Sequence, residues 1–147
     1  MSKKLLILNG PNMNLLGERE AGVYGNKTLE DINMQIESRA NKNGFACEFY
    51  QSNSEGHLID KIHKTRKTVD GIIINAGAYS HYSYAIRDAI AAIKIPVVEV
   101  HYSNIFAREE FRHNSVITPV CCGSILGFGK NSYLLAVDAL IDIITEI

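Results

Sequence analysis

The chain has 147 residues, of which 46% are hydrophobic and 21% are charged, a size and balance typical of one globular domain. Its 15 basic and 16 acidic side chains leave a formal net charge of -1, which excludes a strong overall attraction to nucleic acid or to a membrane surface. No apolar run is long enough for a signal peptide or a spanning helix, so we expect a single cytoplasmic domain over residues 1–147.

Strand and helix patterns alternate along the first half of the chain. The apolar run at residues 4–9 ends at Gly10-Pro11, which predicts a buried strand followed by a turn. Thr28, with Asp31 one helical turn later, indicates the start of a helix. The other elements predicted here are the end of that helix at Asn43-Gly44, a strand at residues 45–51 and a helix over residues 55–67.

The second half of the chain continues this alternation. Residues 71–75 are apolar up to Asn75, as expected for a strand that is covered on both faces of its sheet. Pro96 introduces a fourth apolar strand at residues 97–100. The other elements predicted here are a helix at 82–93, a short helix at 107–113, a fifth strand at 115–120 and a strongly apolar final helix at 132–144.

Five strands that alternate with helices predict an α/β fold with a doubly wound parallel sheet. The flavodoxin-like strand order 2-1-3-4-5 is the natural one for a chain of this size. Ligands of such sheets bind beyond the carboxyl ends of the strands, near the point where the strand order reverses. The loops after the first, third and fourth predicted strands are therefore the candidate site.

The loop after the first strand, residues 9–25, is long and rich in amides and glycines, and it carries Arg19 and Tyr24. A connection longer than about a dozen residues in a compact domain is usually functional, so we interpret this loop as a lid rather than a plain surface loop. After the third strand, Asn75 could fix a ligand oxygen. His81 fits either a ligand-binding residue or an exposed residue in the first turn of a helix.

An acidic residue interrupts the apolar fourth strand. Glu99 is unfavourable there unless it has a partner, and it shares a strand face with His101 because side-chain direction repeats every second residue. A carboxylate beside an imidazole orients the ring and raises its proton affinity, as a general acid or base requires. The alternatives are a purely structural Glu–His pair and a Glu99 that faces solvent at a sheet edge.

Polar and basic residues follow this strand. The backbone N–H groups of the turn at Ser103 and Asn104 could receive a carboxylate or a phosphate. Arg108 and Arg112 are four residues apart and would share a helix face, so that one could reach the ligand while the other makes a surface pair.

Several other classes of site are not indicated. The glycines at residues 123–129 lack the dinucleotide-binding spacing and follow the last strand, so we interpret them as close packing before the final helix. The sequence has no P-loop and no cluster of ligands at metal spacing. Cys47, Cys121 and Cys122 suit neither zinc nor a disulfide framework, and we interpret them as reduced thiols.

These motifs resemble the type II 3-dehydroquinate dehydratases over nearly the whole chain, and several independent motifs occur in the family's order. They are Asn9-Gly10-Pro11-Asn12, Asn14-Leu15-Leu16-Gly17, Arg19 with Tyr24-Gly25, Gln51-Ser52-Asn53 with Glu55-Gly56, Gly71-Ile72-Ile73-Ile74-Asn75, Ala78-Tyr79-Ser80-His81, Arg87-Asp88-Ala89, Pro96-Val97-Val98-Glu99-Val100-His101, Ser103-Asn104, Phe111-Arg112-His113 and Gly127-Phe128-Gly129.

The resemblance implies dehydration of 3-dehydroquinate to 3-dehydroshikimate in the shikimate pathway, which leads to chorismate and the aromatic amino acids, with no metal and no cofactor. It implies that the phenolate of Tyr24, stabilised by Arg19, removes a proton beside the ketone. Asn12 would hold the water that supports the enolate. His101, oriented by Glu99, would protonate the departing hydroxyl.

Substrate binding and assembly are implied in the same way. The family forms homododecamers of four trimers, in which one chain contributes a residue to its neighbour's site. The resemblance assigns the substrate carboxylate to Asn75, Ser103 and the backbone of Tyr102, the ring hydroxyls to His81 and Arg112, and the contribution to the neighbouring site to Asp88.

The expected base needs help to act at neutral pH, because the pKa of a free tyrosine is about 10. Stabilising the phenolate by roughly 3–4 kcal/mol would bring the pKa of Tyr24 close to neutrality. One guanidinium at about 4 Å supplies approximately that much at an effective dielectric constant near 20. Arg19 alone would therefore be sufficient.

The sequence departs from the family pattern at three positions. Ala76 stands where proline is frequent, which affects loop stiffness and no chemical group. Phe106 stands where histidine is common, and Tyr102 where an aliphatic residue is common. Because the backbone is the expected ligand at Tyr102, that change should matter little.

Three other functions fit the predicted fold. A flavin carrier would need a loop rich in Ser, Thr and Gly after the first strand, and this loop contains Pro, Leu and Arg. A response-regulator receiver domain would need an aspartate where the third strand ends in Asn75. A non-catalytic binder of small carboxylates would not need Arg19, Tyr24 and His101 together.

Overall fold

A computed structural model of the chain describes residues 3–18, 22 and 27–146. One sheet of five parallel strands has the order β2-β1-β3-β4-β5, which confirms the predicted flavodoxin-like topology. The strands are β1 (Lys3–Asn9), β2 (Phe45–Gln51), β3 (Gly71–Asn75), β4 (Val97–His101) and β5 (Gly123–Leu126). The α-helices are α2 (Leu29–Asn41), α3 (Glu55–Thr65), α4 (Tyr84–Ala92) and α5 (Lys130–Thr145). The 3-10 helices are η1 (Met13–Leu15), η2 (Gly77–His81), η3 (Ile105–Ala107), η4 (Glu110–His113) and η5 (Thr118–Val120).

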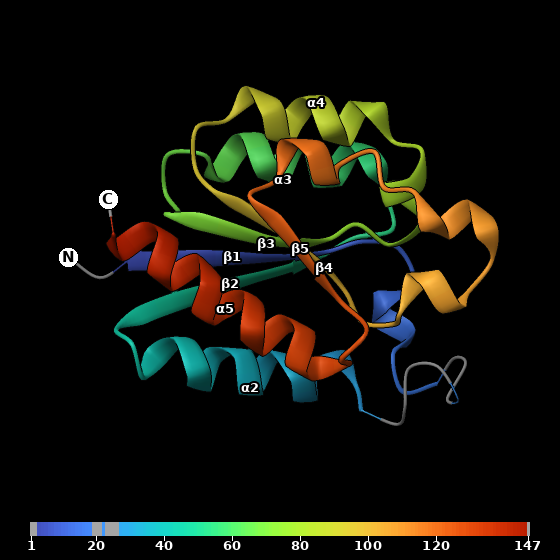
Figure 1. Ribbon diagram of the computed structural model, residues 1–147. Helices are drawn as coiled ribbons and strands as arrows, with labels where there is room; N and C mark the ends of the chain where they lie inside the picture. The colour runs from blue at the N-terminus through green and yellow to red at the C-terminus, as the bar shows by residue number, and fades with distance from the viewer. Residues whose placement is uncertain (1–2, 19–21, 23–26, 147) are drawn as a thin grey trace.

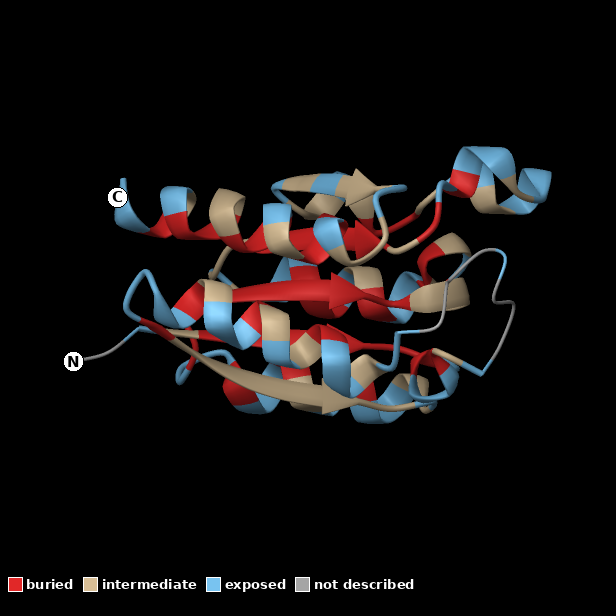
Figure 2. Ribbon diagram, turned by 90° about the horizontal axis from the view of Figure 1, so that it is seen from below, coloured by how far each residue is buried: buried red, intermediate tan, exposed pale blue. Residues whose placement is uncertain are grey.

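Helices cover both faces of the sheet. Helices α2 and α5 lie on one face, and α3 and α4 lie on the other (Figure 1). The central strands are buried and the two edge strands are only partly so, while the outer helix faces are exposed (Figure 2). No helix in the described part of the chain is both long enough and apolar enough to cross a membrane.

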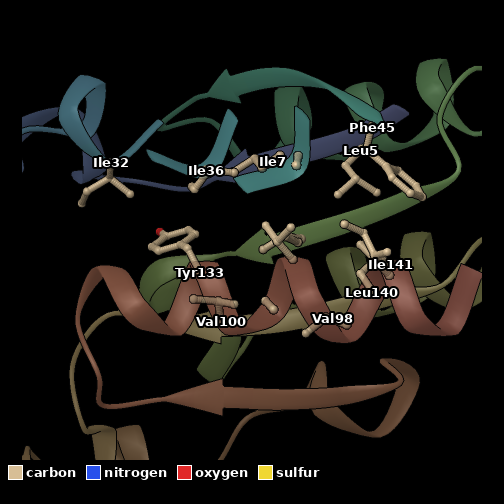
Figure 3. Close-up of a cluster of buried hydrophobic side chains, with 14 of the residues drawn as sticks. Leu5, Ile7, Ile32, Ile36, Phe45, Val98, Val100, Tyr133, Leu140 and Ile141 are labelled. Carbon is tan, nitrogen blue, oxygen red and sulfur yellow. The ribbon is translucent and has the colours of Figure 1, made fainter. Parts of the chain in front are cut away.

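The alternating sheet positions form two hydrophobic clusters. Leu5 and Ile7 point toward α2 and α5, whereas Leu6 and Leu8 point toward α3 and α4. Figure 3 shows the first cluster, in which α5 packs across the sheet with α2 beside it. Two apolar faces per strand explain why residues 5–8 of β1 and 72–74 of β3 are continuously hydrophobic rather than alternating.

Helix α2 begins where the sequence predicted it. The Thr28 hydroxyl accepts a hydrogen bond from the Asp31 backbone N–H at 3.2 Å, and the Asp31 carboxylate accepts one from the Thr28 backbone N–H at 3.1 Å. This reciprocal capping box satisfies N–H groups that a helix start leaves without partners, and it lowers the pKa of Asp31.

The strand register brings polar residues together at one edge of the sheet. Asn9, the last residue of β1, pairs directly with Asn75, the last residue of β3. Glu99 of β4 lies beside Ile74 of β3, so His101 extends past the end of β3. Parallel strands all end at the same edge, which is why residues far apart in the sequence meet there.

The fifth strand lies later in the chain than predicted. Residues 115–120 form a turn that ends in η5, and pairing with β4 starts only at Cys122, whose N–H donates to the Val97 carbonyl at 2.7 Å. Pro119 has no N–H for a strand ladder, and the hydroxyls of Ser115 and Thr118 are used elsewhere. The prediction of a strand at 115–120 is therefore wrong, although the number and order of strands are correct.

The predicted helix at 107–113 is also wrong as a continuous element. It is split into η3 and η4, and Arg108 between them has an extended backbone, with φ of -112° and ψ of -164°. Arg108 and Arg112 therefore do not share a helix face.

We expect Gly71→Ala to destabilise the fold, because a Cβ at Gly71 would lie 2.9 Å from Cγ and Cδ2 of Leu140. Helix α5 would have to move outward, and overpacking of this kind lowers the free energy of unfolding by about 1–3 kcal/mol. Urea unfolding at fixed protein concentration measures the change. Gly123→Ala is the matched control, since a Cβ there meets nothing within 4 Å. Equal unfolding midpoints for the two variants would contradict this packing.

Candidate active site

A cleft opens at the carboxyl edge of the sheet, where the topology predicted a site. Its walls come from the loops after β1, β3 and β4, which are the loops named from the sequence. Of the residues singled out there, it is lined by Asn12, Asn75, His81, His101, Tyr102, Ser103, Arg108 and Arg112, together with Pro11, Met13, Gly77, Ala78 and Ile105.

A buried carboxylate supports the histidine of this cleft. Glu99 is fully buried, and its Oε2 lies 2.6 Å from Nε2 of His101, which is only 5% exposed. The Ser115 hydroxyl donates to the same Oε2 at 2.7 Å, and the Thr118 hydroxyl donates to Oε1. The predicted pairing of Glu99 with His101 is thus present, and two further donors complete it.

The charge state of Glu99 follows from these partners. Burial by itself would raise the pKa of Glu99, because an apolar environment disfavours the carboxylate. The hydrogen bond and charge of His101 oppose this, as do the hydroxyls of Thr118 and Ser115, and the net result is a pKa below the ordinary value. Glu99 is therefore ionised at neutral pH and accepts the hydrogen bond from Nε2 of His101.

His81 lies next to His101 in the cleft wall. The two rings are stacked, with 6.1 Å between centroids and 18° between planes. Nδ1 of His81 is 2.9 Å from the Asn114 carbonyl oxygen, so Nδ1 carries the hydrogen and Nε2 of the neutral ring is an acceptor. Desolvation lowers the pKa of His81, and the charges of His101 and Arg112 lower it further.

Both arginines after β4 line the cleft. Arg108 is mostly buried and donates from Nη1 to the Ser103 hydroxyl at 3.4 Å. Arg112 donates from Nε to Glu109 at 3.0 Å and lies over the ring of Phe111. The sequence predicted one arginine for the ligand and one for a surface pair. Instead, each guanidinium faces the cleft and also has a local partner, which makes this rim suitable for an anion.

The loop after β1 is held against the end of β3. The Gly10 N–H donates to the Asn75 carbonyl at 2.7 Å, and a Cβ at Gly10 would lie only 2.6 Å from the Ala76 oxygen, so glycine is required for this approach. Asn12 is left-handed, with φ of 70°, and its N–H donates to the side chain of Asn53 at 3.0 Å. This geometry turns Asn12 toward the cleft.

In the described part of the chain, two predicted site residues do not line the cleft: Asp88 and Glu99, which is fully buried and bonded to His101. Arg19 and Tyr24 lie outside the described residues. Asp88 is exposed on α4 and does not line the cleft. In the described part of the chain, no group of three or more His, Cys, Asp or Glu side chains is arranged to hold a metal ion.

Sequence reasoning missed Ser115 and Thr118 as partners of Glu99. Both were predicted to lie in a strand, where residues three apart point to opposite faces of the sheet, so they could not both have bonded to Glu99. The presence of Pro119 next to Thr118 was the available signal, because proline argues against a strand at this position.

The fold and the cleft together define a flavodoxin-like α/β protein with a buried acid–base pair facing a small, basic-rimmed cleft. Comparison with known proteins narrows this class. The chain belongs to the dehydroquinase class II family, whose model matches residues 3–141.

Individual relatives agree with the family assignment. The chain is 58% identical to a 3-dehydroquinate dehydratase of Caldicellulosiruptor bescii over 143 residues, covering 97% of this chain and 99% of that protein. A type II dehydroquinase crystal structure from Butyrivibrio crossotus is 49% identical, superposes with a TM-score of 0.93 and covers 95% of this chain and 98% of that one. One from Propionibacterium acnes is 41% identical, with a TM-score of 0.92 over 97% of this chain and 98% of that one.

We expect Thr118→Val to make the protein more sensitive to acid. The folded pKa of Glu99 is below its unfolded value, so its contribution to stability is present above the unfolded pKa and is lost as the pH falls through the folded pKa. Removing one hydroxyl donor raises the folded pKa, so the acid-unfolding midpoint should move to higher pH. Circular dichroism during acid titration measures it.

Thr145→Val is the control for this change, because the Thr145 hydroxyl bonds only to backbone carbonyls of α5 among the contacts that the structure describes. Its acid-unfolding midpoint should match that of the unmodified protein. A Thr118→Val midpoint equal to that of this control would show that the hydroxyl does not support the Glu99 carboxylate.

Proposed function

We propose that this protein is a 3-dehydroquinate dehydratase that converts 3-dehydroquinate to 3-dehydroshikimate in the shikimate pathway to chorismate and the aromatic amino acids. The observation that carries the proposal is the buried Glu99–His101 pair at the cleft of a chain that belongs to the dehydroquinase class II family. The reaction removes a proton beside the ketone and a hydroxyl from the adjacent carbon, and it releases one water.

In this proposal His101 is the general acid. The ionised Glu99 carboxylate holds Nε2 of the ring, so Nδ1 delivers its proton to the departing hydroxyl. As the ring loses that proton it stays oriented, because the Glu99 bond involves the other nitrogen. Because Ser115 and Thr118 fix the Glu99 carboxylate, it cannot move with the imidazole ring of His101. The ring is therefore held in one orientation, with Nδ1 directed at the departing hydroxyl.

The remaining cleft residues bind the substrate. Asn75, the Ser103 hydroxyl and the backbone N–H of Tyr102 hold the carboxylate. Nε2 of His81 accepts from a ring hydroxyl, since its Nδ1 hydrogen is committed to Asn114. Arg112 donates to ring hydroxyls.

The proton acceptor is Tyr24, and Arg19 keeps it deprotonated, while Asn12 holds a water that stabilises the enolate oxygen. These roles rest on the resemblance of the loop sequence and on the position of Asn12 in the cleft wall. Acid and base would then act from different loops, which allows both to reach one substrate.

The same resemblance supports the proposed assembly and setting. The protein acts as one catalytic domain in a homododecamer of four trimers, and Asp88, which is exposed on α4, reaches the site of a neighbouring subunit. It works in the cytoplasm and needs no metal or cofactor. Size-exclusion chromatography with light scattering tests the oligomer.

The direct test of the activity is incubation of the purified protein with 3-dehydroquinate. The product is a conjugated enone, so its formation is followed by ultraviolet absorbance. Absence of turnover across the neutral pH range would sink the proposed function.

We expect His101→Ala to reduce kcat by about 10²–10⁴-fold, the usual range for loss of a general acid. Steady-state kinetics on 3-dehydroquinate measures it. His63→Ala removes an exposed histidine on α3 that does not line the cleft, and it should leave kcat unchanged. Activity of the His101→Ala variant near that of His63→Ala would remove His101 from the mechanism.

We expect Tyr24→Phe to bind substrate but not turn it over, because only the proton acceptor is lost. Arg19→Ala should move the limb of the pH–rate profile that reports the base to higher pH, since the phenolate loses its positive neighbour. Binding is measured by calorimetry and the profile by initial rates. An unshifted profile in Arg19→Ala with nearly full turnover would show that Arg19 does not control the base.

A further inference from the structure

A chain of three buried polar side chains lies behind the cleft. The Tyr133 hydroxyl donates to Oδ1 of Asn9 at 2.6 Å and accepts from Nδ2 of Asn75 at 2.9 Å. All three residues are almost fully buried, with exposed fractions of 1% for Asn9, 4% for Asn75 and 0% for Tyr133. We propose that Tyr133 is a positioning residue, which fixes the amide of Asn75 in the orientation that binds the substrate.

The direction of each hydrogen bond in this chain is determined. The Gly77 backbone N–H donates to Asn75 at 3.1 Å, so the amide oxygen must face Gly77. The amide nitrogen then faces Tyr133, and the tyrosine oxygen must accept from it. The single hydroxyl hydrogen of Tyr133 is therefore left for Asn9.

Packing alone does not explain the hydroxyl of Tyr133. The ring belongs to the aliphatic cluster between the sheet and α5, where a phenylalanine would fill the same space (Figure 3). In that view Tyr133 lies at the end toward which the strand arrows point, which is the edge that carries the cleft. A buried hydroxyl is unfavourable without partners, and here it bonds to two asparagines at strand ends.

Tyr133 thereby connects α5 to the cleft. It lies in the first turn of this helix, 58 residues after Asn75 in the chain. Without its hydroxyl, the only other acceptor recorded for the Asn75 amide nitrogen among the described residues is Sδ of Met13 at 3.7 Å, a weak acceptor. The Gly77 N–H would still hold the amide oxygen, but the amide nitrogen would lose its strong partner, so its N–H would be less firmly directed at a ligand oxygen.

This inference rests on the proposed function, in which Asn75 holds the substrate carboxylate. The carboxylate is bonded to the carbon that loses the hydroxyl, but its charge does not change during the reaction, so we expect Asn75 to contribute similarly to the substrate and transition-state complexes. Losing such uniform binding raises KM and leaves kcat nearly unchanged. A defect in folding would instead lower the concentration of active enzyme and leave KM unaltered.

Tyr133→Phe is therefore expected to raise KM for 3-dehydroquinate by about tenfold, the loss of roughly one hydrogen bond, with kcat almost unchanged. The Kd of quinate, a hydroxy-carboxylate that cannot be dehydrated to the enone, should rise in parallel by calorimetry. Thr65→Val is the matched control, since it removes a similarly buried hydroxyl, 3% exposed, from α3. Its KM and quinate Kd should equal those of the unmodified protein.

A double-mutant cycle with Asn75→Ala tests whether Tyr133 acts through Asn75. If it does, adding Tyr133→Phe to Asn75→Ala should raise KM no further. Fully additive effects, or an unchanged KM and quinate Kd in Tyr133→Phe, would overturn the inference. An unmodified protein that binds quinate but does not turn over 3-dehydroquinate would overturn the proposed function alone. Failure of both binding and turnover would overturn both.

Discussion

The site depends on a carboxylate buried in the middle of an apolar sheet. Glu99 is fully enclosed, and it stays charged only because His101, Ser115 and Thr118 all donate to it. The desolvation of such a group is unfavourable by several kcal/mol, and the partners offset it only if each remains in place. The segment after η4 is therefore constrained to return over β4, and this return decides where the last strand can begin.

The same constraint explains why the floor and the rim of the cleft have different roles. Its floor is rigid, because the asparagines at the ends of β1 and β3 and the Glu99–His101 pair of β4 belong to buried strands. Its rim is built around the 3-10 helices η3 and η4, with Arg108 between them and Arg112 in η4. Groups that must keep a fixed direction lie on the floor, and groups that bind by charge lie on the rim, where small displacements matter less.

The sheet topology determines where the site lies but not which reactive groups it contains. Many proteins share a doubly wound sheet, and the carboxyl edge is the binding edge in all of them. In this protein the acid–base and binding groups are polar residues at that edge, and several of them are hydrogen-bonded to residues from other parts of the chain. Tyr133 on α5 and Ser115 after η4 are such partners, and Tyr133 belongs to none of the loops that the topology named.

The sequence by itself determined the order of the strands, the edge that carries the cleft and the pairing of Glu99 with His101. The strands and the Glu99–His101 pairing depend on local periodicity: continuous apolar runs for strands covered on both faces, and a repeat of two for side chains that share a strand face. The strand order and the cleft edge were expected from the usual topology of parallel sheets in chains of this size. The capping of α2 by Thr28 and Asp31 is equally local, and the sequence predicted it correctly.

Only the tertiary structure decided what surrounds those residues. The last strand is Gly123–Leu126 rather than 115–120, and the expected helix is interrupted at Arg108. The Tyr133 hydroxyl bonds to Asn9, which lies 124 residues earlier in the chain. The physical reason is that a buried polar atom is satisfied by whichever partner the folded chain brings within hydrogen-bonding distance. That partner is chosen by the packing of whole elements, and no local pattern in the sequence records it.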